Sequence, residues 1–218
     1  MDAAAPRYRT AIEAASLIVG PALMSIGDLF HPPESWDVNA QYSMIAATST
    51  SGRWHMAHLL LFLGMLLFVP GILAMTRLAS NRRPAIGYAA RILLVISVGA
   101  LSAVFVFEMV LGHFISAGAD QAAAILLLGT FQSGAVFGAL MPGLFAFFIG
   151  VALATVALAS GAGPYRWPML TLALGATFIL GEIVLAQVLL SQIGNILCLV
   201  AGIGFALPLL RGAGEVPA

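Results

Sequence analysis

Residues 53–75 read RWHMAHLLLFLGMLLFVPGILAM, and no Asp, Glu, Lys or Arg occurs between Arg53 and Arg77. A helix rises about 1.5 Å per residue, so this stretch is long enough for the ~30 Å hydrocarbon core of a bilayer. Two histidines, His55 and His58, stand at its beginning, three residues apart and therefore on one helical face. The stretch predicts a membrane-spanning helix that carries ionisable groups at one end.

Apolar runs of this kind recur along the chain, which has 218 residues, 61% of them hydrophobic and only 8% charged. Soluble domains carry about 25% charged residues, so that class is excluded. We expect one all-α domain over residues 1–218, a bundle of six transmembrane helices. The expected spans are residues 10–30, 55–78, 88–115, 133–159, 167–190 and 192–211.

The basic residues predict the orientation of this bundle. All nine are arginines, and with the N-terminus in the cytoplasm only Arg53 falls outside. Such a bias over short loops follows the positive-inside rule, so we expect both termini in the cytoplasm and a location in a bacterial inner membrane. The net charge is zero and no basic tract occurs, which argues against a nucleic-acid partner. A single cysteine, Cys198, rules out an intrachain disulfide.

Two connections on the expected outer side, residues 32–53 and 116–132, are longer than hairpins require. Each is expected to hold a short interfacial helix, one from Asp37 to Thr48 and one that Asp120 caps and that runs through Leu128. Long loops on one face often carry binding sites, although plain connectors are the alternative.

Small residues at four-residue spacing indicate close contacts between helices. The expected fourth span carries Gly134 and Gly138, followed by Gly143, and the sixth carries Gly194, Cys198 and Gly202. These stripes predict a compact bundle or a contact face in a homo-oligomer.

Four histidines and three carboxylates inside or beside the spans fall toward the expected outer surface. They are Asp28, His31, His55, His58, Glu108, His113 and Glu182. A charged side chain at bilayer depth costs about 3 kcal/mol on insertion scales, so such residues are usually retained for a partner or a function. We therefore expect several of them to converge in one pocket.

Imidazole and carboxylate groups together are ligands for zinc or non-haem iron. The predicted metal ligands are His55, His58, His31, His113 and Asp28. Glu182 and Glu108 are the predicted catalytic acids or bases. This pattern favours a metal-dependent membrane enzyme, a hydrolase or an oxidoreductase, that acts on a lipid-like or other hydrophobic molecule.

Three other interpretations stay open. Two histidines can ligate haem b in a membrane electron carrier, with Gly112 and the fourth span making room for the porphyrin. The carboxylates alone can bind protons or a cation during transport, or protonate an isoprenoid in a cyclase. A structural subunit would pair these residues with one another, for example Glu108 with Glu182 or Asp28 with Arg53, or would satisfy Asp28 with amide groups.

Overall fold

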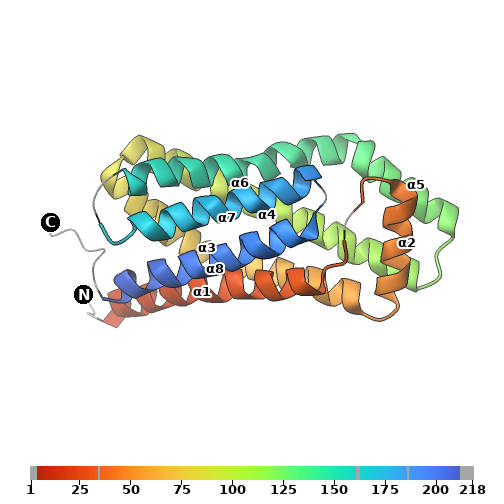
Figure 1. Ribbon diagram of the computed structural model, residues 1–218, viewed down its shortest axis with the longest axis horizontal. Helices are drawn as coiled ribbons and strands as arrows, with labels where there is room; N and C mark the ends of the chain where they lie inside the picture. Colours follow the sequence, from red (N-terminus) through yellow and green to blue (C-terminus); the bar gives the residue numbers. More distant parts are fainter. Residues whose placement is uncertain (1–3, 34, 161–162, 186, 212–218) are drawn as a thin grey trace.

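The computed structural model describes residues 4–33, 35–160, 163–185 and 187–211, and this part of the chain is helical (Figure 1). The helices are α1 (Ala4–Phe30), α2 (Val38–Ser49), α3 (Arg53–Arg82), α4 (Pro84–Ser116), α5 (Gln121–Ser133), α6 (Ala135–Ala159), α7 (Arg166–Leu185) and α8 (Val188–Leu210).

Six of the helices in the described residues, α1, α3, α4, α6, α7 and α8, are long and apolar enough to cross a membrane. They run along the long axis of the molecule, with both termini at one end and the short helices α2 and α5 at the other (Figure 1). The sequence-based prediction of six apolar spans is confirmed. The direction in which they insert stays a prediction.

One predicted boundary is wrong. The fifth span was expected to run to residue 190, but α7 ends at Leu185 and α8 begins at Val188 after an extended Gln187. Ser191 therefore lies in the first turn of α8, where its hydroxyl contacts the Asp28 carboxylate of α1 at 3.0 Å. This contact between distant segments is not encoded in local hydropathy, and no Gly or Pro marks the break.

The small residues of α8 allow close packing, as predicted. A Cβ at Gly202 would overlap the backbone carbonyl oxygen of Leu17 in α1, and one at Gly194 would come within 2.8 Å of the Gly175 carbonyl oxygen in α7. In α6 only part of the predicted stripe behaves this way. Gly143 packs on Ala100 of α4, whereas no described atom lies within 4 Å of the place that a Cβ at Gly138 would take.

The two short helices cover one end of the bundle. Asp120 accepts a hydrogen bond from the Ala123 backbone N–H (3.0 Å), which is the cap that the sequence predicted. Asp37, expected as the first residue of its helix, is instead the cap of α2 and accepts from the Ala40 backbone N–H (2.8 Å). Their apolar side chains join a small core around the fully buried Trp54. Its members are Ile45, Trp54, Leu111, Ile115, Ala124 and Leu128. Whether α2 and α5 lie in a membrane interface stays a prediction.

The opposite end of the bundle holds a buried ion pair that the sequence pattern did not predict. Glu13 of α1 is 5% exposed and binds Arg77 of α3 through both carboxylate oxygens, one of them at 2.7 Å from Nη2. Arg9 adds a third contact at 2.9 Å. This cluster joins α1 to α3.

Candidate functional site

Two histidines and one glutamate meet between α1, α3 and α4. Nε2 of His31 lies 3.2 Å from Nε2 of His58, and the latter lies 2.9 Å from Oε2 of Glu108. His58 is fully buried and His31 is 8% exposed. We call these three residues the triad. Two imidazoles and a carboxylate within hydrogen-bond reach form a chain of proton-binding groups.

Backbone carbonyls determine which ring nitrogens of the triad carry hydrogen. Nδ1 of His58 lies 2.8 Å from the Trp54 carbonyl oxygen, and Nδ1 of His31 lies 2.8 Å from that of Pro32. A carbonyl oxygen only accepts, so both Nδ1 atoms donate and both Nε2 atoms face the triad. In neutral rings these Nε2 atoms are acceptors, and so is an ionised Glu108. One additional proton among the three groups is therefore needed to turn these contacts into hydrogen bonds.

Trp54 holds the triad in place. Its ring packs against that of His58 at an interplanar angle of 35°, with centroids 4.2 Å apart, and its indole N–H donates to the Glu108 backbone carbonyl at 2.7 Å. The indole fits because α4 has Gly112 at the point of contact, where any Cβ would overlap the Trp54 ring. Trp54 therefore occupies the space at Gly112 that was expected to admit a porphyrin. The haem interpretation stays a prediction.

Burial keeps His31 neutral. The side chain lies at the end of α1, beyond the spanning segment, and its burial lowers the pKa to about 4, with the nearby His58 imidazole acting in the same direction. A neutral imidazole whose Nδ1–H is already donated presents Nε2 as a hydrogen-bond acceptor. His31 is therefore the group of the triad that accepts a hydrogen bond from His58.

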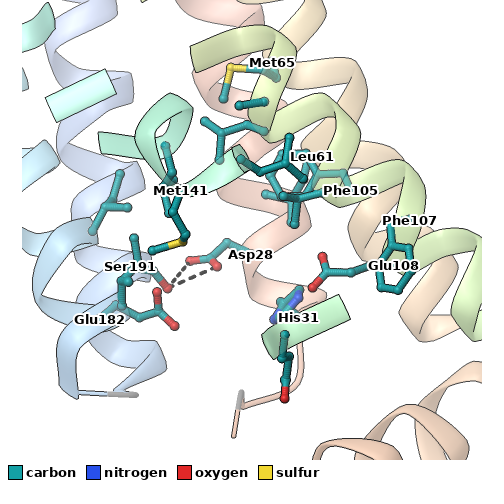
Figure 2. A pocket seen from close by; sticks show the side chains of 18 of the residues that line it. Asp28, His31, Leu61, Met65, Phe105, Phe107, Glu108, Met141, Glu182 and Ser191 are labelled. Carbon is teal, nitrogen blue, oxygen red and sulfur yellow. Dashed lines mark hydrogen bonds between the residues drawn. The ribbon is translucent and has the colours of Figure 1, made fainter. Parts of the chain in front are cut away.

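A second polar group comes from α1, α7 and α8. The Ser191 hydroxyl contacts both oxygens of Asp28, at 3.2 and 3.0 Å, and the Asn195 amide lies beside the same carboxylate. Figure 2 shows Glu182 of α7 next to Ser191 and directed toward the same space. We call Asp28, Glu182, Ser191 and Asn195 the acidic wall. Asp28 is 7% exposed and Asn195 is 5% exposed, so much of this wall is buried.

The triad and the acidic wall line one cavity of about 240 Å³. His31 and Glu108 reach the cavity, whereas His58 is not among its lining residues and connects the two from behind. Figure 2 shows the polar groups near one end and the apolar Leu61 and Met65 near the other. The cavity is therefore amphipathic, with ionisable groups at the end that α2 and α5 cover.

The remaining predicted residues lie differently. His55 of α3 and His113 of α4 face each other edge to face with ring centroids 6.3 Å apart, and His113 is exposed. Neither lines the cavity. In the described ranges no group of three or more His, Cys, Asp or Glu side chains is arranged to hold a metal ion. The predicted five-residue metal site is thus not shown.

Two pairings expected for a purely structural role are wrong, whereas Asp28 does have an amide group, that of Asn195, beside it. Glu108 binds His58 rather than Glu182, and Arg53 donates to the Phe30 carbonyl oxygen at 2.7 Å rather than to Asp28. Neither Asn195 nor the role of Trp54 was predicted from the sequence. Ser191 and Asn195 are four residues apart in a mostly apolar helix, and this spacing was the available signal for a shared polar face.

The fold places the chain in the class of multi-pass helical membrane proteins. Comparisons with models of known families, with curated proteins and with solved structures find no match for this chain. Its function must therefore be inferred from the cavity itself.

Proposed function

We propose that the protein is a membrane enzyme that binds a lipid-like molecule in the cavity and moves a proton on it through the triad. The observation that carries this proposal is the order of the three groups: Glu108 and His31 face the cavity, and His58 contacts both from behind. Two cavity-facing groups with a buried connection can act as acid and base on the same ligand.

The chemistry needs no further reactant. Glu108 takes up the proton that it shares with His58 and donates it to one carbon atom of the bound molecule. This transfer frees Nε2 of His31 to remove a proton from another carbon atom. His58 then accepts that proton from His31 at Nε2, where it is again shared with Glu108, so the triad ends as it began. The net reaction is an isomerisation. General acid–base catalysis of this kind typically contributes about 10²- to 10⁴-fold in rate.

The surroundings of the triad suit such a reaction. An apolar cavity excludes water and strengthens the interaction between Glu108 and His58. The Nδ1–H bonds to Pro32 and Trp54 fix both ring orientations, so the Nε2 atoms stay directed at each other.

Deuterium incorporation tests the proposal even while the substrate is unidentified. Lipids that co-purify with the protein are incubated with it in D₂O, extracted and compared by mass spectrometry. We expect at least one lipid species to gain carbon-bound deuterium with the wild-type protein, and Glu108→Gln to slow this gain by about 100-fold or more. Asp120→Asn, which retains the helix cap, is the matched control. Equal exchange with wild type and Glu108→Gln, or no exchange in any lipid, contradicts the proposal.

A divalent metal in place of the shared proton is the second candidate, because metal-bound histidines also donate Nδ1–H to carbonyl oxygens. His31, His58 and Glu108 would hold zinc or iron after a small rearrangement, and the metal would supply an activated water for hydrolysis. Elemental analysis decides: about one metal per chain that His58→Ala removes supports this candidate. Haem b would require the two imidazoles to separate, and a Soret band would reveal it.

A further inference from the structure

The acidic wall has more hydrogen-bond acceptors than donors. Ser191 has a single hydroxyl hydrogen, yet its Oγ lies within reach of both Asp28 oxygens and of the Val188 carbonyl oxygen. Among the described residues no hydrogen bond reaches the Glu182 carboxylate or the buried Oδ1 of Asn195. Asn195 lines the cavity, so a ligand bound there lies beside the residue that carries this unsatisfied acceptor. The wall therefore suits a ligand that brings N–H or O–H donors.

The wall also lacks a positive charge. Glu108 has His58 as its partner, whereas Asp28 contacts only the neutral Ser191 and Asn195. The lining residues include three carboxylates and, within the described part of the chain, no arginine. Carboxylates in an apolar medium are normally paired with a cation or a proton. A cationic ligand would supply the missing charge.

Aromatic rings complete the lining. They belong to Trp36, Phe105, Phe107, Phe131, Phe147 and Phe148. Phe107 and Phe131 stack on each other with centroids 3.7 Å apart, which gives α4 and α5 a continuous aromatic surface. Rings of this kind attract organic cations through their faces and also accommodate apolar groups.

We infer that the cavity selects an amphiphilic organic ammonium, with the charged nitrogen at Asp28 and Glu182 and the apolar body toward Leu61 and Met65. This inference rests on the proposed function insofar as both require a hydrophobic ligand in the cavity. An organic ammonium fits better than a bare metal ion, since the described residues do not arrange three ligand groups around one point. A nitrogen with at least one N–H also satisfies Oδ1 of Asn195.

The size of the cavity limits the ligand. Pockets for drug-sized molecules measure about 300–1,000 Å³, and this cavity of about 240 Å³ is slightly smaller. A single ring with a short alkyl chain and one amino group is therefore an appropriate probe.

Three matched probes test the inference: phenylbutylamine, its trimethylammonium analogue and phenylbutanol. Binding is measured by calorimetry at neutral pH on protein in nanodiscs of zwitterionic phosphatidylcholine, with empty nanodiscs as the blank. We expect the amine to bind at least about tenfold more tightly than the alcohol, because only the amine carries both the charge and several N–H donors. The trimethylammonium compound, which keeps the charge but donates no hydrogen bond, is expected to fall between them.

The variants separate the wall from the rest of the cavity. In Asp28→Asn/Glu182→Gln the preference for amine over alcohol should fall to about twofold or less, with alcohol binding retained as evidence of an intact cavity. Glu182→Gln alone serves as a milder variant if the double variant does not fold. Asp120→Asn, which removes an exposed carboxylate outside the cavity, should preserve the full preference.

The outcomes distinguish this inference from the proposed function. Equal affinity of wild type for amine and alcohol, or an undiminished preference in both wall variants, overturns the ammonium inference and leaves proton transfer by the triad intact. If none of the three probes binds, the cavity does not take up a hydrophobic molecule of this size. Both the ammonium inference and the proposed function are then overturned. In Glu108→Gln, loss of deuterium exchange supports proton transfer by the triad. Retained preference for the amine in the same variant supports the ammonium inference independently.

Discussion

Acidification from about pH 7 to about pH 5 is expected to destabilise the folded protein through His31. Burial lowers the pKa of His31 from 6.5 to about 4. Between these values the unfolded chain binds a proton that the folded protein does not, so stability falls as the pH falls. Linkage with these two pKa values gives a loss of about 2 kcal/mol at pH 5.

The assay is urea or thermal unfolding of the detergent-solubilised protein at each pH, for wild type and His31→Gln. The variant has no imidazole at this position, so its stability should depend on pH less steeply, by about 2 kcal/mol over the same interval. His113→Gln is the control, because this histidine is exposed and should leave the slope unchanged. A slope that His31→Gln does not alter would refute the assignment of a buried neutral imidazole.

Three further predictions concern packing and charge. Glu13→Gln should lower the free energy of unfolding by about 2 kcal/mol. This is less than the roughly 3–5 kcal/mol lost when a fully buried ion pair is broken, because Arg77 is 29% exposed. A double-mutant cycle with Arg77→Met should show strong coupling between the two residues in unfolding free energy. Gly202→Ala should lower the free energy of unfolding by about 1–3 kcal/mol, because the new Cβ would meet the Leu17 carbonyl oxygen. Gly138→Ala, where no described atom is close, should be neutral or stabilising. Equal thermal unfolding midpoints for the two variants would contradict the packing described for α8. Gly112→Ala should displace Trp54 and slow the deuterium exchange assay while Asp120→Asn does not.

The sequence was sufficient to predict the spans because bilayer thickness sets their length and few charges interrupt them. The cap of α5 was also predicted, since Asp120 precedes an apolar stretch. The break between α7 and α8 was misplaced because Ser191 looks like a loop residue and is instead oriented by Asp28, more than 160 positions away in the chain.

The site was predicted in part. The positions of the histidines and three carboxylates along the spans predicted that they lie near one end of the bundle. The rotation of each helix about its own axis, however, depends on packing at residues such as Gly112 and Trp54. That rotation decides that His58 faces Glu108 while His55, three residues away, faces His113. Periodicity indicates which residues share a face and cannot tell which neighbour that face meets.

The central claim, that His31, His58 and Glu108 share one proton in a fixed order, is tested most directly by ¹⁵N NMR of histidine-labelled protein in bilayers. We expect both Nδ1 atoms to be protonated, Nε2 of His31 to be unprotonated, and Nε2 of His58 to carry a hydrogen-bonded proton whose signal changes in Glu108→Gln. Nε2–H tautomers at both His31 and His58 would contradict this claim. So would a His58 signal that is the same in wild type and in Glu108→Gln.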